Sequence, residues 1–164
     1  MSEKTGIQGM LTKYLPGYKG YLEENSRRDE DKQIRELISK KIDEGISNLE
    51  ATKLEMVNCL KLAMMGKIDT PISKLMKNRD KIRFATYGYT GWFSEKTIDV
   101  AKLEEIQGYD KSLYNDVENI LGLCEDIKDS IDSDDEMKDL FKELNTSISN
   151  LNSAISARDD MMKE

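Results

Sequence analysis

Apolar residues recur in steps of three and four along two long stretches of the C-terminal half. The stretch 99–131 has an apolar residue at every such position except Asp110 (Leu103, Ile106, Leu113, Val117, Ile120, Cys124, Ile127 and Ile131). The stretch 134–162 repeats the pattern with the single exception of Arg158 (Met137, Phe141, Leu144, Ile148, Leu151, Ile155 and Met162). This spacing is typical of helices packed along one face. It therefore predicts two long amphipathic helices, each with one charge on its buried side.

The first half predicts two more helices. A stripe of apolar residues over 26–65 ends at Gly66, a residue type common just after helices. Its members are Ile34, Leu37, Ile38, Ile42, Ile46, Leu49, Met56, Val57, Leu60, Ala63 and Met64. Gly45 lies on this stripe and suggests a close helix crossing. A shorter helix over 71–86 is expected to begin at Pro71 with Thr70 as its N-cap, and to bury Phe84 with its other apolar residues.

The ends of these helices carry capping signals. Ser26 and Asp99 are suited to N-caps of the first and third helices. Ser133 and Glu136 have the spacing of a capping box for the last helix. Residues 5–15 are compatible with one further short amphipathic turn. We therefore expect an all-α fold, an antiparallel bundle of four helices (26–65, 71–86, 99–131 and 134–162), within a single domain spanning 1–164.

The two charged residues on the seams are expected to meet. The turn near residue 133 is short, so the last two helices should lie antiparallel. Asp110 lies 23 residues before this centre and Arg158 lies 25 after it, so they should face each other at similar height. A hydrogen-bonded pair is tolerated in a core far better than a lone charge. Arg79 or Arg83 is the rival partner of Asp110, and solvent at a loose bundle end is the remaining alternative.

Charge is unevenly distributed along the chain. The net charge is −7. Residues 1–98 hold 18 basic and 14 acidic side chains (+4), whereas residues 99–164 hold 7 basic and 18 acidic ones (−11). The overall negative charge disfavours binding to double-stranded nucleic acid. The two halves are expected to attract each other.

The residue types present exclude several kinds of catalytic site. The chain contains no histidine, which removes imidazole-based metal sites and His-dependent acid–base chemistry. Asp132, Asp134 and Glu136 imitate part of a calcium-binding loop, but Met137 stands where the loop needs glycine. No metal or cofactor is therefore expected. Cys59 and Cys124 lie among apolar residues and are expected to be buried, free thiols, as in a reducing cytoplasm.

The strongest candidate for a binding surface combines a basic helix with the aromatic loop that follows it. Arg79, Arg83, Tyr87, Tyr89, Trp92 and Phe93 are of the residue types that dominate protein interfaces. Residues 74–93 could alternatively contact an anionic membrane or single-stranded nucleic acid. The remaining interpretation is structural: the aromatic residues close the bundle end, and the basic face pairs with the acidic half.

Two groups of short motifs are similar to an uncharacterised family of small prokaryotic helical proteins. The first group is Tyr18-Lys19-Gly20-Tyr21 followed by Arg27, Arg28, Asp31 and Arg35; the second is Tyr87-Gly88-Tyr89-Thr90-Gly91-Trp92-Phe93, followed by Ile98-Asp99 and by Tyr109-Asp110 with Leu113. Trp92-Phe93 departs from the smaller pair expected there. The family has no assigned activity, so the resemblance implies no catalytic residue. It does imply that Asp110 shares a polar arrangement with Arg28, Asp31 and Arg35.

These patterns favour a non-enzymatic interaction or scaffold protein of the cytoplasm, with coiled-coil-like seams and an unknown protein partner. One alternative is a peripheral membrane adaptor that uses residues 74–93. Another is an enzyme with a polar site near Asp110 and Arg158. Self-association stays open.

Overall fold

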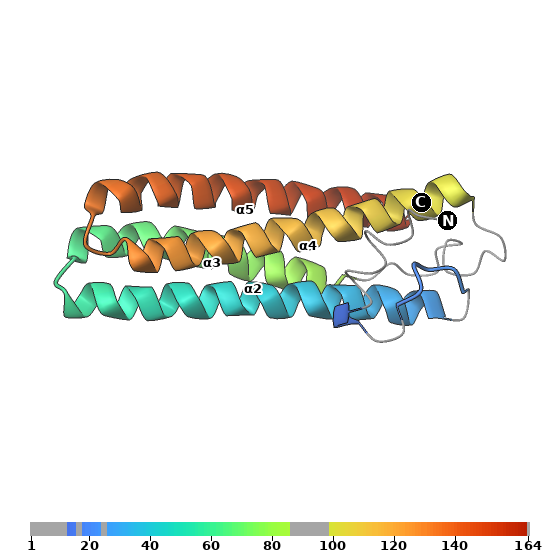
Figure 1. Ribbon diagram of the computed structural model, residues 1–164, viewed down its shortest axis with the longest axis horizontal. Helices are drawn as coiled ribbons and strands as arrows, with labels where there is room; N and C mark the ends of the chain where they lie inside the picture. Colours follow the sequence, from blue (N-terminus) through green and yellow to red (C-terminus); the bar gives the residue numbers. More distant parts are fainter. Residues whose placement is uncertain (1–12, 16–17, 24–25, 86–98, 164) are drawn as a thin grey trace.

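Four long helices make up most of the molecule (Figure 1). The computed structural model describes residues 13–15, 18–23, 26–85 and 99–163. The helices are α2 (Arg27–Asn58), α3 (Leu62–Arg83), α4 (Val100–Asp129) and α5 (Asp134–Lys163). The predicted all-α, four-helix fold is confirmed.

The bundle consists of two antiparallel hairpins, α2–α3 and α4–α5 (Figure 1). Helix α2 packs beside α4, and α3 packs beside α5. Within each hairpin the helices run in opposite directions, whereas the neighbours from different hairpins run in the same direction (Figure 1). Both hairpin turns therefore lie at one end of the bundle, and residues 18–23 lie at the other.

The core is built from the predicted seams. Every seam residue of α4 and α5 is buried except Ile131, which is partly exposed, and Asp110 and Arg158 are buried with the apolar members. Helices α2 and α3 add Ile34, Ile38, Ile42, Leu49, Ile68 and Leu75 to the same core. Three-four spacing thus identified the buried face because both hairpins bury one continuous stripe of each helix.

The boundary between the first two helices was predicted wrongly. Helix α2 ends at Asn58 rather than near Met65, and α3 already begins at Leu62, so Pro71 lies inside α3 instead of at its start. The end of α2 is a Schellman motif: the Lys61 amide donates to the Met56 carbonyl at 2.8 Å, and the Leu60 amide donates to that of Val57 at 3.1 Å. Its left-handed position, usually glycine, is occupied by Leu60 with φ 58°.

Several residues expected in the core are consequently exposed. The chain reverses direction between α2 and α3, so the buried stripe does not continue through this region. The exposed residues at and beside the turn are Val57, Cys59, Leu60 and Ala63. The prediction that both thiols are buried holds only for Cys124. Phe84, the residue directly after α3, is also exposed.

Two of the four predicted N-caps are present, and Thr70, which was expected to cap the second helix, lies inside α3. The Asp99 carboxylate accepts from the Ala101 amide at 3.3 Å, and the Ser133 hydroxyl accepts from the Glu136 amide at 3.4 Å. Ser26 precedes α2 but makes no side-chain cap bond to it; its hydroxyl donates to the Glu23 carbonyl instead. Among the described helices, none combines the length and the apolar character that crossing a membrane requires.

Candidate functional site

The predicted docking surface is only partly within the described residues. Tyr87, Tyr89, Trp92 and Phe93 lie outside them. Arg79 and Arg83 on α3 both bind Asp43 of α2, at 2.9 Å and 2.6 Å. The two guanidinium groups therefore hold one hairpin together. The expectation that they pair with the acidic 99–164 half is wrong.

Asp43 is the centre of this contact. Partial burial opposes its ionisation, but the hydrogen bonds and charges of Arg79 and Arg83 outweigh that effect and hold its pKa below the usual range. The carboxylate is therefore ionised down to a lower pH than a free aspartate, and the contact persists under mild acid.

Asp110 and Arg158 form the predicted ion pair. Arg158 Nε donates to Asp110 Oδ1 at 2.8 Å, and the two side chains are 1% and 0% exposed. The pair lies between α4 and α5, as the antiparallel arrangement required. The rival partners Arg79 and Arg83 contact Asp43 instead.

Two further residues complete this buried polar cluster. Arg158 Nη2 donates to Asp31 Oδ1 of α2 at 2.7 Å, and the Tyr21 hydroxyl donates to Asp110 Oδ2 at 2.5 Å. Asp31 Oδ2 in turn accepts from Arg35 Nε at 2.9 Å. A shared arrangement of Asp110 with Asp31 and Arg35 is therefore present, whereas Arg28 lies on the exposed surface. Arg158 thus joins the two hairpins in the interior of the bundle, toward the end opposite the hairpin turns.

The cluster also fixes residues 18–23 against the bundle. Arg27 Nε donates to the Tyr21 carbonyl at 3.0 Å, and Gln107 Nε2 donates to the Gly20 carbonyl at 3.0 Å. Tyr21 has φ 64° and a fully buried side chain. A tyrosine in the left-handed region costs roughly 1–2 kcal/mol, which the buried hydroxyl contact must offset. Sequence spacing could not reveal Tyr21, because it lies in an irregular segment.

Burial dominates the electrostatics of the cluster. It raises the pKa of Asp110 despite the opposing charge of Arg158 and the Tyr21 hydrogen bond, and it raises the pKa of Tyr21 well above its usual value. The pKa of Tyr18 is raised for the same reason, with Asp110 adding to the effect. The Tyr18 hydroxyl is buried near Asp110 but makes no hydrogen bond of normal geometry within the described residues. All of these groups lie in the interior of the bundle.

The end of the bundle formed by the hairpin turns carries a group of exposed apolar residues that the sequence pattern did not predict. Four exposed apolar residues lie here, and we call them the apolar end patch. Their exposed fractions are 63% for Leu54, 40% for Val57, 80% for Leu60 and 65% for Leu62. They occupy the last turn of α2, the connection and the first position of α3. The apolar spacing predicts Val57 and Leu60 in the core, because it continues the first helix through both residues.

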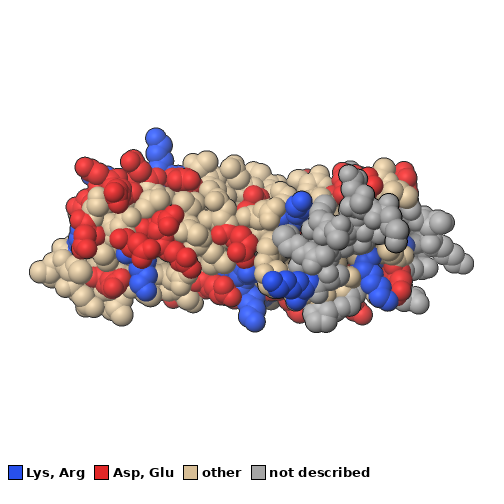
Figure 2. Space-filling view, viewed as in Figure 1, with Lys and Arg blue, Asp and Glu red and all other residues tan. Residues whose placement is uncertain are grey.

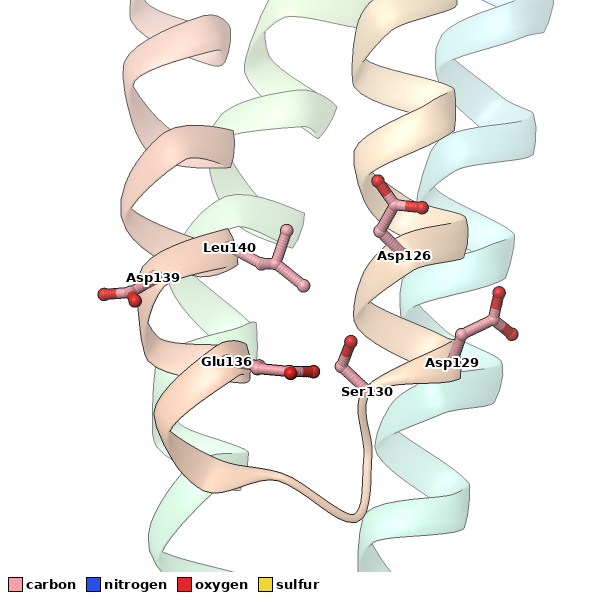
Figure 3. A pocket seen from close by; sticks show the side chains of 6 residues that line it. All are labelled: Asp126, Asp129, Ser130, Glu136, Asp139 and Leu140. Carbon is pink, nitrogen blue, oxygen red and sulfur yellow. The ribbon is translucent and has the colours of Figure 1, made fainter.

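An acidic groove of about 380 Å³ lies at the same end, between α4 and α5 (Figure 3). Its lining residues are Asp126, Asp129, Ser130, Glu136, Asp139 and Leu140. Glu136 and Leu140 point from α5 toward α4, and Ser130 faces Glu136 (Figure 3). Figure 2 shows acidic side chains gathered over this end of α4 and α5, next to a nearly uncharged surface at the α2–α3 turn.

No metal-binding group is present in the described part of the chain, where no three Cys, Asp or Glu side chains are placed to hold an ion. Burial raises the pKa of the Cys124 thiol to about 12, so this thiol is unreactive at neutral pH. Cys59, by contrast, is an exposed free thiol beside the apolar end patch.

No protein-family model, curated protein or solved structure matches this chain.

Proposed function

We propose that this chain is a non-enzymatic interaction or scaffold protein that works in the cytoplasm. The observation that supports the proposal most is the apolar end patch. Leu54, Leu60 and Leu62 are each more than half exposed within a span of nine residues. Single exposed apolar residues are ordinary, but a concentration of them is typical of protein-interaction surfaces.

Leu60 strengthens this argument, because the residue contributes little to the fold of the chain. Its side chain is 80% exposed, and its backbone has φ 58°, where leucine is disfavoured and glycine is not. A glycine would satisfy the Schellman motif equally well. A leucine at this position is therefore better explained by contact with another molecule than by stability.

The buried cluster supports the non-enzymatic part of the proposal. Asp110, Arg158 and Tyr21 are at most 1% exposed and hydrogen-bond to one another. A substrate would need access to at least one of them to use the cluster as a catalytic site. Membrane contact through 74–93 gains no support from Arg79 and Arg83, since both are engaged with Asp43.

Cys59 offers a direct test of the proposed interaction surface. A thiol-reactive photo-cross-linker will attach at Cys59, since Cys124 is buried and its pKa is raised. Illumination in a lysate of the host should give a discrete cross-linked product. Excess unlabelled wild-type protein should suppress this product, whereas unlabelled Leu60→Gly protein should not.

The Leu60→Gly competitor must be folded for this comparison. Because Leu60 buries little area and adopts a left-handed conformation, the substitution should leave the free energy of unfolding unchanged or raise it by up to about 1 kcal/mol. Urea unfolding measures this directly. Absence of a discrete product, or equal competition by the Leu60→Gly protein, would contradict the proposal.

A further inference from the structure

We infer that the partner bound at this end of the bundle is a cationic amphipathic helix of another protein. The inference rests on the proposed function and specifies the chemistry of the partner. Its apolar face would contact the apolar end patch, and its Lys or Arg side chains would contact the acidic groove.

The patch and the groove lie at the same end of the bundle, and one ion pair joins the α2–α3 turn to the start of α5 there. Lys61, between Leu60 and Leu62, reaches across to α5, where its Nζ lies 2.9 Å from Asp134 Oδ1. Asp134 and the groove residue Glu136 both lie in the first turn of α5. Figure 1 shows the two hairpin turns at the same end. A single helical segment could therefore contact both.

The charge at this end favours a basic partner. Four acidic residues line the groove: Asp126, Asp129, Glu136 and Asp139. The Glu136 side chain points from α5 toward α4, whereas the carboxylates of Asp129 and Asp139 point outward at its two sides (Figure 3). Asp126 and Asp129 lie in the last turn of α4, where the helix dipole disfavours negative charge. The Lys61 contact also lowers the pKa of Asp134 through its hydrogen bond and charge. An ammonium group of the chain itself thus already pairs with a carboxylate at this end.

The same charges argue against two other occupants. An anionic membrane would be repelled by the acidic groove. A second copy of the chain would bring its own acidic end toward this one in a two-fold arrangement, because such an interface places the same patch on both subunits. A basic amphipathic helix satisfies the apolar and the acidic parts together.

The probe for the test is a fluorescent peptide of about 15 residues, made of Leu and Lys in the order that gives an amphipathic helix. Fluorescence anisotropy at low salt should detect its binding to the wild-type protein. Replacing its Lys by Glu, or its Leu by Ser, should each weaken binding at least about tenfold. Raising the salt concentration should weaken it as well.

Matched protein variants locate the site. Leu60→Gly should weaken peptide binding about tenfold, whereas Val100→Ser, which removes an exposed apolar residue at the opposite end, should change it less than about twofold. Asp129→Asn/Glu136→Gln should also weaken binding about tenfold. Glu104→Gln/Glu105→Gln removes the same charge from an exposed part of α4 near its start and should have little effect.

Three outcomes would overturn the inference. The first is equal binding of the Leu/Lys and Leu/Glu peptides. The second is Leu/Lys binding that is insensitive to Leu60→Gly or to Asp129→Asn/Glu136→Gln. The third is sedimentation showing a wild-type dimer that Leu60→Gly abolishes, which would assign the patch to a second copy. If the Cys59 cross-link forms in lysate but the Leu/Lys peptide does not compete with it, this inference fails while the proposed function stands.

Discussion

At the scale of single residues, Arg158 has the largest structural role. Its guanidinium contacts Asp110 on the neighbouring helix and Asp31 on the opposite hairpin, at 2.8 Å and 2.7 Å, with all three side chains at most 2% exposed. Since isolated buried charges are very unfavourable, each of the three depends on the others.

Arg158→Met should therefore destabilise the protein by roughly 3–5 kcal/mol, because it leaves the buried Asp110 carboxylate without a guanidinium and Asp31 with Arg35 alone. Asp110→Asn should lower the free energy of unfolding by a smaller amount, because Arg158 still contacts Asp31. Urea unfolding at neutral pH measures both. Arg79→Met is the control: its ion pairs are partly exposed, so its loss should cost no more than about 1 kcal/mol. If Arg158→Met lowered the free energy of unfolding by no more than Arg79→Met does, the buried ion pair would not be essential for stability.

The meeting of Asp110 and Arg158 could be predicted from sequence because both residues interrupt otherwise apolar seams. Tyr21 could not be predicted in this way. It belongs to no periodic element, and its hydroxyl reaches Asp110 from 89 positions away in the chain. Asp31 was linked to Asp110 only through the family resemblance, since α2 and α4 could be placed side by side only by the tertiary structure.

At the scale of helices, residue pattern predicted the elements better than their ends. The apolar stripe of α2 continues past Asn58 through Leu60 and Ala63, and no glycine or proline marks the turn. The Schellman geometry is made by the backbone, with leucine at the position where glycine is the usual signal. The strongest signals for a helix boundary in this region are Gly66 and Pro71, and both lie inside α3.

Gly45 gives a prediction at this scale. The sequence suggested that it permits a close helix crossing, but a Cβ there would make ordinary contacts, the nearest 3.6 Å from Leu121 Cδ2. Gly45→Ala should thus raise the free energy of unfolding by roughly 1 kcal/mol through higher helix propensity. Gly122→Ala in α4, where nothing lies within 4 Å, measures propensity alone. Destabilisation by Gly45→Ala together with stabilisation by Gly122→Ala would show that the crossing needs glycine.

At the scale of the whole molecule, ion pairs join the elements, so stability should depend on pH. The pKa of Asp43 is lowered, so its contribution is present above the unfolded pKa near 4 and is lost as the pH falls through the folded value. The pKa of Asp116 is raised by burial, so its ionisation reduces stability as the pH rises through the folded value.

Two substitutions should consequently change the melting temperature in opposite directions. Asp43→Asn should lower it at about pH 7, and the difference from wild type should shrink toward about pH 3. Asp116→Asn should raise it at about pH 7, with a difference that also shrinks in acid. Thermal unfolding followed by circular dichroism across this range measures both. If both substitutions shifted the melting temperature in the same direction at about pH 7, these two carboxylates would not titrate as inferred.

The sequence by itself determined the four helices, the face that each buries and the height at which Asp110 meets Arg158. These follow from local spacing and from one short turn, both of which can be read along the chain. The tertiary structure alone decided that neighbouring helices of the two hairpins run in the same direction, that Tyr21 and Asp31 complete the buried cluster, and that the apolar end patch and the acidic groove lie at the same end of the bundle. The physical reason is that helical periodicity specifies which side of a helix is covered, whereas the packing of distant segments decides what covers it.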